Sequence, residues 1–100
     1  MNREKVPNGL YACPCCGYAT IFEPECYEIC EICFWEDDGQ DDPAQNKCFG
    51  GPNHVPLTEA RRNYLVFGAA ELKDLSKVRS PKHEDVKLRN YSLQYAIIKT

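Results

Sequence analysis

The sequence of 100 residues contains no run close to the roughly 20 consecutive apolar residues that a membrane-spanning helix needs. It also lacks a basic N-terminal region leading into an apolar stretch, so we expect no signal peptide. No internal repeat or low-complexity segment divides the chain. These absences predict one small domain, residues 1–100, that stays in the cytoplasm and does not bind membranes.

Features of catalytic sites are scarce as well. Only two histidines occur, His54 and His83, and neither has a partner at a recognisable spacing. The sequence contains no phosphate-binding glycine loop, no cofactor fingerprint and no nucleophile next to a base. The sequence therefore predicts that the protein is not an enzyme.

Cysteine, in contrast, is abundant, with seven residues. An odd count without a signal peptide argues against a disulfide framework, and a reducing compartment favours metal binding. Four cysteines form two C-x-x-C pairs with thirteen residues between them. Two such turns can bring four thiolates to a tetrahedral zinc at about 2.3 Å. We predict a structural Zn²⁺ site, with Fe as the alternative metal, formed by Cys13, Cys16, Cys30 and Cys33.

Three further cysteines, Cys15, Cys26 and Cys48, fall outside these pairs. Cys15 occupies an x position of the first pair, so we expect its side chain to point away from the metal as a free or partly buried thiol. The alternative is a reactive thiol or a replacement ligand. We expect Cys26 and Cys48 to be spare thiols; in the alternative they share a second metal with Cys15.

The residues between the pairs predict a hairpin. Residues 18–22 and 27–30 are rich in strand-forming residues, and Pro24 lies in the turn between them. We therefore expect a small α+β fold, in which a zinc-ribbon-like β-hairpin with two C-x-x-C knuckles occupies residues 11–46. Two or three short helices from residues 47–100 would pack on it, and Phe34 and Trp35 would cover the metal.

Helical patterns appear in the second half. The first expected helix has Thr58 as N-cap and ends at Gly68, with an apolar stripe formed by Leu57, Ala60, Tyr64 and Phe67. A second short helix is expected over residues 70–78, with one apolar side formed by Leu72, Leu75 and Val78. The tail, residues 84–100, fits either a helix or a strand, and we favour the helix.

Charge is divided unequally along the chain. Residues 1–46 carry two bases and ten acids, a net charge of −8, whereas residues 47–100 carry +5. The two halves can attract each other, or the acidic half can bind a basic protein surface. We expect a solvated loop from the five carboxylates after the second pair, Glu36, Asp37, Asp38, Asp41 and Asp42. We do not expect nucleic acid as a partner, because the basic side chains of the second half are scattered and form no concentrated positive patch. They belong to Arg61, Arg62, Lys73, Lys77, Arg79 and Lys82.

Three stretches, "CPCCGY", "YEICEICFWEDDGQDDP" and "GGPNHVPLTEARRNYLVFG", resemble the bacterial cysteine-rich CPCC family. The resemblance covers residues 11–68 and continues weakly through "VRSP". The second pair of that family usually reads C-P-x-C, so Glu31 is a departure that should loosen this turn without removing a ligand. The resemblance implies metal binding, and some relatives occur near bacterial toxin and immunity systems.

Together these patterns predict a small cytosolic zinc-binding protein that acts as a protein-interaction module. Its partner would be another protein with a basic surface, and an immunity-like or regulatory role is one version of this function. Two alternatives remain: a redox sensor that uses Cys15 as an exposed thiol, and a nucleic-acid-binding zinc ribbon.

Overall fold

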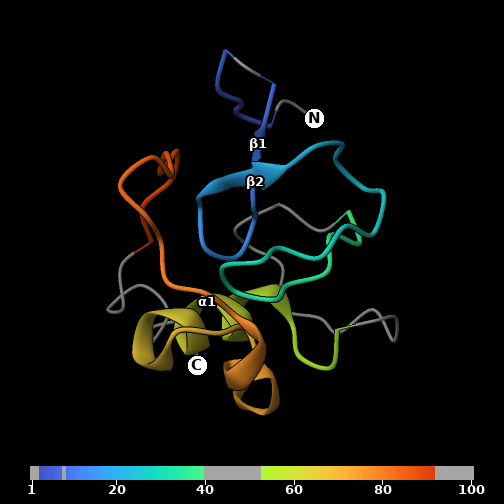
Figure 1. Cartoon of the computed structure of the whole chain (residues 1–100). Coiled ribbons are helices and arrows are strands. Elements are labelled where there is room, and N and C mark those ends of the chain that lie inside the picture. Colours follow the sequence, from blue (N-terminus) through green and yellow to red (C-terminus); the bar gives the residue numbers. More distant parts are fainter. Residues whose placement is uncertain (1–2, 8, 40–52, 92–100) are drawn as a thin grey trace.

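The computed structural model describes residues 3–7, 9–39 and 53–91. Two short antiparallel strands, β1 (Tyr11–Ala12) and β2 (Ala19–Ile21), are followed by helix α1 (Leu57–Phe67) and the 3₁₀ helix η1 (Leu72–Lys77). In Figure 1 the strands lie above the two helices, and the segment after β2 forms a wide loop at the right. No helix in the described ranges has the length and apolarity needed to cross a membrane.

Each C-x-x-C turn is flanked by its own pair of extended segments. β1 and β2 pair around the first turn, with Tyr11 opposite Ile21, and an isolated bridge between Ile29 and Glu36 flanks the second turn. The predicted pairing of residues 18–22 with residues 27–30 is therefore wrong. Because a C-x-x-C turn itself reverses the chain, the segments on either side of one turn meet. Residues 22–29 therefore connect the two turns and form no strand that pairs with residues 18–22.

Helix α1 begins two residues earlier than predicted. Its N-cap is Pro56 instead of Thr58, and the Pro56 carbonyl accepts a hydrogen bond from the Ala60 amide at 3.0 Å. Proline suits a helix start, because its φ, here −67°, already matches the helix. The predicted end is confirmed: Gly68 adopts a left-handed φ of 99°, and its amide donates to the Tyr64 carbonyl.

The predicted apolar stripe of α1 packs toward the core. Leu57 and Ala60 are fully buried, and Tyr64 packs against the same cluster. This cluster includes Trp35, which is fully buried as predicted, whereas Phe34 is only partly buried. The core therefore lies between the two cysteine turns and one face of α1.

The second predicted helix forms as η1, but it buries a different side. Leu72 is 65% exposed and Leu75 is 42% exposed, whereas Asp74 is buried. A 3₁₀ helix has three residues per turn, so Leu72 and Leu75 lie in one row, and that row faces outward. Asp74 is paired with the Nζ atoms of Lys73 and Lys77, at 2.9 and 3.3 Å. Leu72 and Leu75 thus share one side, as predicted, but that side is largely exposed.

The favoured helix over the start of the tail is wrong as well. Residues 84–91 contain no helix; Lys87 forms a bridge with Tyr18, and the Ala19 amide donates to the Val86 carbonyl at 2.8 Å. The edge of β2 offers backbone groups that an extended neighbour can pair with, and pairing here prevails over the helical pattern. Residues 92–100 lie outside the described residues.

The predicted attraction between the two halves is seen, within the described residues, in ion pairs of Arg79 and Arg89. The guanidinium of Arg79 lies 2.6 Å from the Glu31 carboxylate, and that of Arg89 lies 2.7 Å from the Glu4 carboxylate. Arg79 also pairs with Asp85 at 2.8 Å, and its hydrogen bonds lower the pKa of Asp85 to about 2. These contacts attach residues 79–89 to the cysteine-rich half.

The predicted solvated acidic loop is wrong at Asp37. This carboxylate is fully buried and accepts hydrogen bonds from the guanidinium of Arg3 at 2.5 and 3.2 Å. It also accepts hydrogen bonds from the amides of Glu25 and Gly39. A buried charge needs such partners, because desolvation without them is costly. Of the other predicted loop acids, Glu36 and Asp38 are partly buried, and Asp41 and Asp42 lie outside the described residues.

Replacing Arg3 by methionine should lower the free energy of unfolding by about 3–5 kcal/mol, because it leaves the buried Asp37 carboxylate without its cation. Lys5→Met is the control, since Lys5 is an exposed base on the same segment. Denaturant unfolding measures both variants. Equal, small losses in the two variants would contradict the structural role of the Arg3–Asp37 pair.

Candidate metal centre

The first cysteine turn is closed by two backbone hydrogen bonds. The Cys13 amide donates to the Tyr18 carbonyl at 2.8 Å, and the Gly17 amide donates to the Cys13 carbonyl at 2.9 Å. Gly17 has a left-handed φ of 86°, a conformation that glycine adopts more readily than residues with a side chain. The Gly17 carbonyl in turn accepts hydrogen bonds from the amides of Leu88 and Arg89, so a distant segment lies directly over this turn.

The second turn repeats the same backbone pattern. The Cys30 amide donates to the Trp35 carbonyl at 2.9 Å, and the Phe34 amide donates to the Cys30 carbonyl at 2.7 Å. Phe34 occupies the place that Gly17 has in the first turn, and it too is left-handed, with φ of 70°. A phenylalanine in this conformation costs roughly 1–2 kcal/mol. The two turns are therefore structurally equivalent despite their different sequences.

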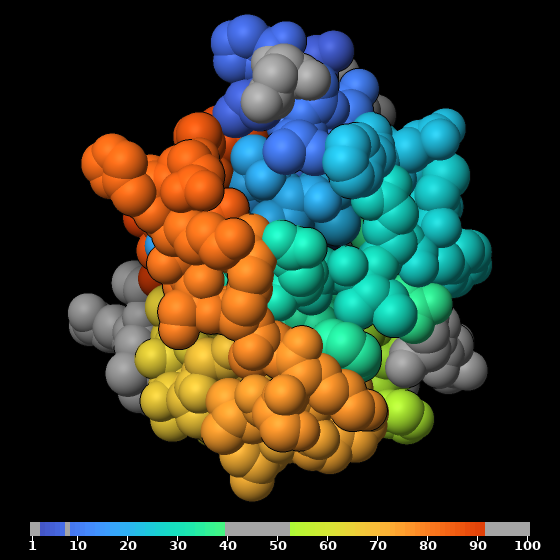
Figure 2. All heavy atoms as spheres, viewed as in Figure 1, coloured from blue at the N-terminus to red at the C-terminus, as the bar shows by residue number. Residues whose placement is uncertain are grey.

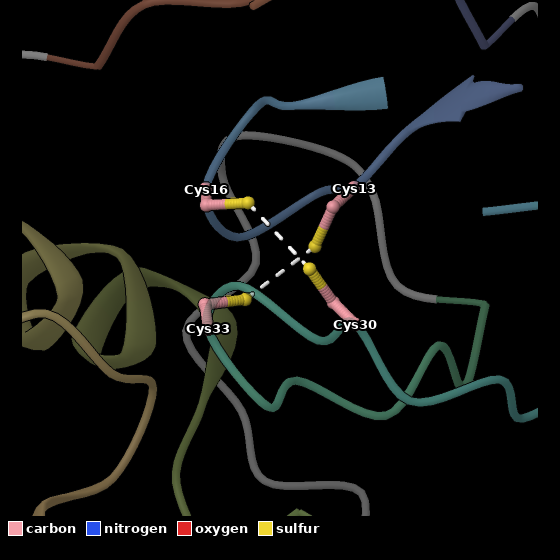
Figure 3. Close-up of side chains that lie close together, drawn as sticks. All are labelled: Cys13, Cys16, Cys30 and Cys33. Atoms are coloured by element: carbon pink, nitrogen blue, oxygen red, sulfur yellow. Dashed lines mark hydrogen bonds between the residues drawn. The ribbon is translucent and has the colours of Figure 1, made fainter. Parts of the chain in front are cut away.

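These turns bring four sulfur atoms to one point (Figure 3). Sγ of Cys13 lies 3.6 Å from Sγ of Cys33, Sγ of Cys16 lies 3.7 Å from Sγ of Cys30, and all four sulfurs are within 4.8 Å of one another. A tetrahedron with metal–sulfur bonds of about 2.3 Å has sulfur–sulfur edges of about 3.8 Å. The four predicted cysteines are thus positioned to bind a metal ion.

The electrostatics of the cluster also suit a cation. Burial raises the pKa of Cys13 and of Cys33 well above the ordinary thiol value. Burial acts in the same direction on Cys30, but hydrogen bonds from the other three thiols and from Thr20 outweigh it and lower the pKa of Cys30 well below that value. Four thiolates cannot share so small a buried space without a compensating positive charge.

Three contacts that the sequence analysis missed hold the turns in place. The hydroxyl of Thr20 donates to Sγ of Cys30 at 3.1 Å. Nε of the buried Arg61 donates to the Pro14 carbonyl at 2.8 Å, and the Ala70 amide donates to the Cys33 carbonyl at 2.7 Å.

Only one of these residues left a signal in the sequence. Arg61 lies four residues after Leu57 and three before Tyr64, so its position falls on the apolar stripe of α1. A base at such a position indicates a buried partner. Thr20 is an ordinary strand residue, and nothing in its sequence context points to a sulfur contact.

Cys15 is 1% exposed and belongs to the core cluster, outside the group of four. Cys15, which we expected to be a free or partly buried thiol, is therefore fully buried. The alternative of a redox sensor required an exposed Cys15, and that exposure is contradicted. Cys26 is exposed, and its pKa is raised by partial desolvation and by the carboxylates of Glu23, Glu28 and Asp37. Cys48 lies outside the described residues, and the residues described hold no second group of metal ligands.

A model of the family described as Cysteine-rich CPCC matches residues 11–85. The chain belongs to the cysteine-rich CPCC family. The match extends beyond the motifs at residues 11–68, and it includes η1 and the segment that pairs with Glu31 through Arg79. No curated protein and no solved structure matches this CPCC protein significantly.

In this CPCC protein, Gly17→Ala should lower the free energy of unfolding by more than the cost of placing alanine at a left-handed φ. An added Cβ would lie 2.3 Å from the Arg89 carbonyl oxygen, so a backbone segment must move. Gly9→Ala is the matched control, because Gly9 has a φ of 104° but no atom within 4 Å of the added Cβ. We expect roughly 1–2 kcal/mol for Gly9→Ala and a clearly larger loss for Gly17→Ala in denaturant unfolding. Equal losses would show that the close approach of residues 88–89 does not matter.

Proposed function

We propose that the protein binds one structural Zn²⁺ through Cys13, Cys16, Cys30 and Cys33, and that the resulting zinc-ribbon-like scaffold serves as a protein-interaction module. The observation that carries the proposal is the meeting of four buried sulfurs within 4.8 Å on two equivalent turns. Sites with four cysteine ligands are typical of structural zinc.

A structural role follows from the number of ligands. Four protein thiolates fill a tetrahedral zinc, so no coordination position is left for water or substrate. The metal would instead supply folding free energy, on the order of 10–16 kcal/mol in small zinc peptides. The need for such a contribution is plain, because β1 and β2 contain only two and three residues.

Binding of another protein is favoured over the two alternatives. A redox sensor would need Cys15 to be accessible, and Cys15 is buried. A nucleic-acid site would need exposed basic side chains that are not already paired within the protein. Arg61, however, is buried against the Pro14 carbonyl, and Arg79 is paired with Glu31 and Asp85. The net charge of −8 in residues 1–46 instead supports a partner with a basic surface.

Metal analysis of protein purified without added metal tests the site. We expect one zinc per chain in the wild type and in Cys15→Ser, and loss of zinc in Cys16→Ser, which removes a thiolate from the group of four. The two variants change neighbouring buried cysteines, so each controls for the other. Loss of zinc in Cys15→Ser alone would mean that the ligands are wrongly assigned. If iron is found in place of zinc, the proposed identity of the metal is wrong.

Thr20→Val should weaken metal binding without abolishing it. The hydroxyl of Thr20 donates a hydrogen bond to Sγ of Cys30 and stabilises its negative charge, and loss of such outer contacts costs about 10–100-fold in metal affinity. Competition with a chelator of known affinity measures the change. An unchanged affinity would show that this hydrogen bond does not support the bound metal.

A further inference from the structure

The loop between β2 and the second cysteine turn, residues 22–29, exposes an unusual amount of apolar surface. Phe22 is 77% exposed, Tyr27 is 58% exposed and Ile29 is 49% exposed. In Figure 2 this segment lies at the right-hand edge of the molecule as cyan to teal spheres, away from the helices. Three large apolar side chains that are exposed within eight residues are typical of an interaction site.

The loop is held in one conformation by carboxylates. The two oxygens of Glu28 accept hydrogen bonds from the amides of Phe22 and Glu23, at 2.8 and 2.7 Å. The Tyr27 amide donates to the Asp37 carbonyl at 3.0 Å, and the Glu25 amide donates to the Asp37 carboxylate at 3.1 Å. Because Asp37 is itself buried and paired with a base, the loop is attached to the core and does not depend on its own apolar residues for order.

The backbone of the loop is strained at two positions. Glu25 and Tyr27 have left-handed φ values of 65° and 62°, although neither is glycine. Each such residue costs roughly 1–2 kcal/mol, which the surrounding hydrogen bonds must offset. The hydrogen bonds therefore hold a fixed loop with exposed aromatic residues despite this strain. A fixed loop loses little conformational entropy when it binds, which favours affinity.

The surroundings of these apolar residues are acidic. Glu23 and Glu25 are exposed within the loop. Residues 22–31 contain no lysine or arginine. A surface of this kind is complementary to lysine and arginine side chains around an apolar patch, and it is repelled by phosphate groups of nucleic acids and of acidic lipids.

We propose that residues 22–29 form the docking loop for a protein partner, which presents Lys and Arg side chains around a pocket for Phe22 and Tyr27. This inference rests on the protein-interaction role proposed above and assigns its location. Aromatic residues in the centre of an interface commonly carry most of the binding energy, and charged residues at its rim set partner choice.

The test uses the zinc-loaded full chain and an array of short peptides of equal length. All peptides share one apolar pattern with Leu and Phe, and their polar positions are all Lys, all Ser or all Asp. We expect binding to Lys peptides only, with affinity that falls as salt is raised. The double variant Phe22→Ser/Tyr27→Ser should lose about tenfold or more in affinity, the loss that 1.4 kcal/mol of binding energy corresponds to.

Two matched controls separate the loop from general surface effects. Val66→Ser/Leu72→Ser removes equally exposed apolar side chains on the helical side and should leave binding unchanged. Glu23→Gln/Glu25→Gln should weaken binding and reduce its salt dependence, whereas Glu59→Gln/Glu84→Gln, which changes exposed acids elsewhere, should not. Zinc content is measured for every variant, so that a failure to fold is recognised.

The outcomes distinguish this inference from the function on which it rests. If the wild type binds Lys peptides and the loop variants bind them equally well, the docking loop is wrong while a basic partner remains supported. If the zinc-loaded wild type binds no peptide class in a charge-dependent way, both the loop and the basic partner are rejected, and the zinc site is unaffected. Self-association that disappears in Phe22→Ser/Tyr27→Ser would identify a second copy as the occupant and overturn the proposal.

Discussion

Four buried cysteine sulfurs meet at one point, and the rest of the structure depends on this meeting. Burial raises the pKa of Cys13 and Cys33, so these two thiols are difficult to ionise unless a cation compensates their charge. The strands that flank the sulfurs are too short to hold them together alone. Metal binding and folding of this half are therefore expected to be one process.

The later part of the chain acts as a support for the two cysteine turns. Arg61 from α1 binds the first turn at Pro14, and the segment near Leu88 covers the same turn at Gly17. In the second turn, the Cys33 carbonyl accepts a hydrogen bond from the Ala70 amide, and the side chain of Glu31 pairs with Arg79. Each turn is thus fixed from two sides by residues that follow it by more than 35 positions.

The sequence predicted those features that depend on local spacing. The C-x-x-C pairs identify the four cysteines that meet, and Gly68 marks the end of α1. The features that were missed depend on partners far along the chain. Strand propensity does not select the partner of a strand, so the predicted pairing of residues 27–30 was wrong. The burial of Asp37 depends on Arg3 and on the amides of Glu25 and Gly39. The extended conformation of residues 84–91 is likewise set by the open edge of β2.

X-ray absorption spectroscopy of the protein as purified is the sharpest test of the four-sulfur site, because it reports the ligands of the bound metal in the intact chain. We expect a zinc edge and four sulfur ligands at about 2.3 Å, with no nitrogen or oxygen ligand. A shell that contains nitrogen or oxygen ligands, or fewer than four sulfurs, would contradict the site formed by the two cysteine turns and the closed coordination from which its structural role was inferred.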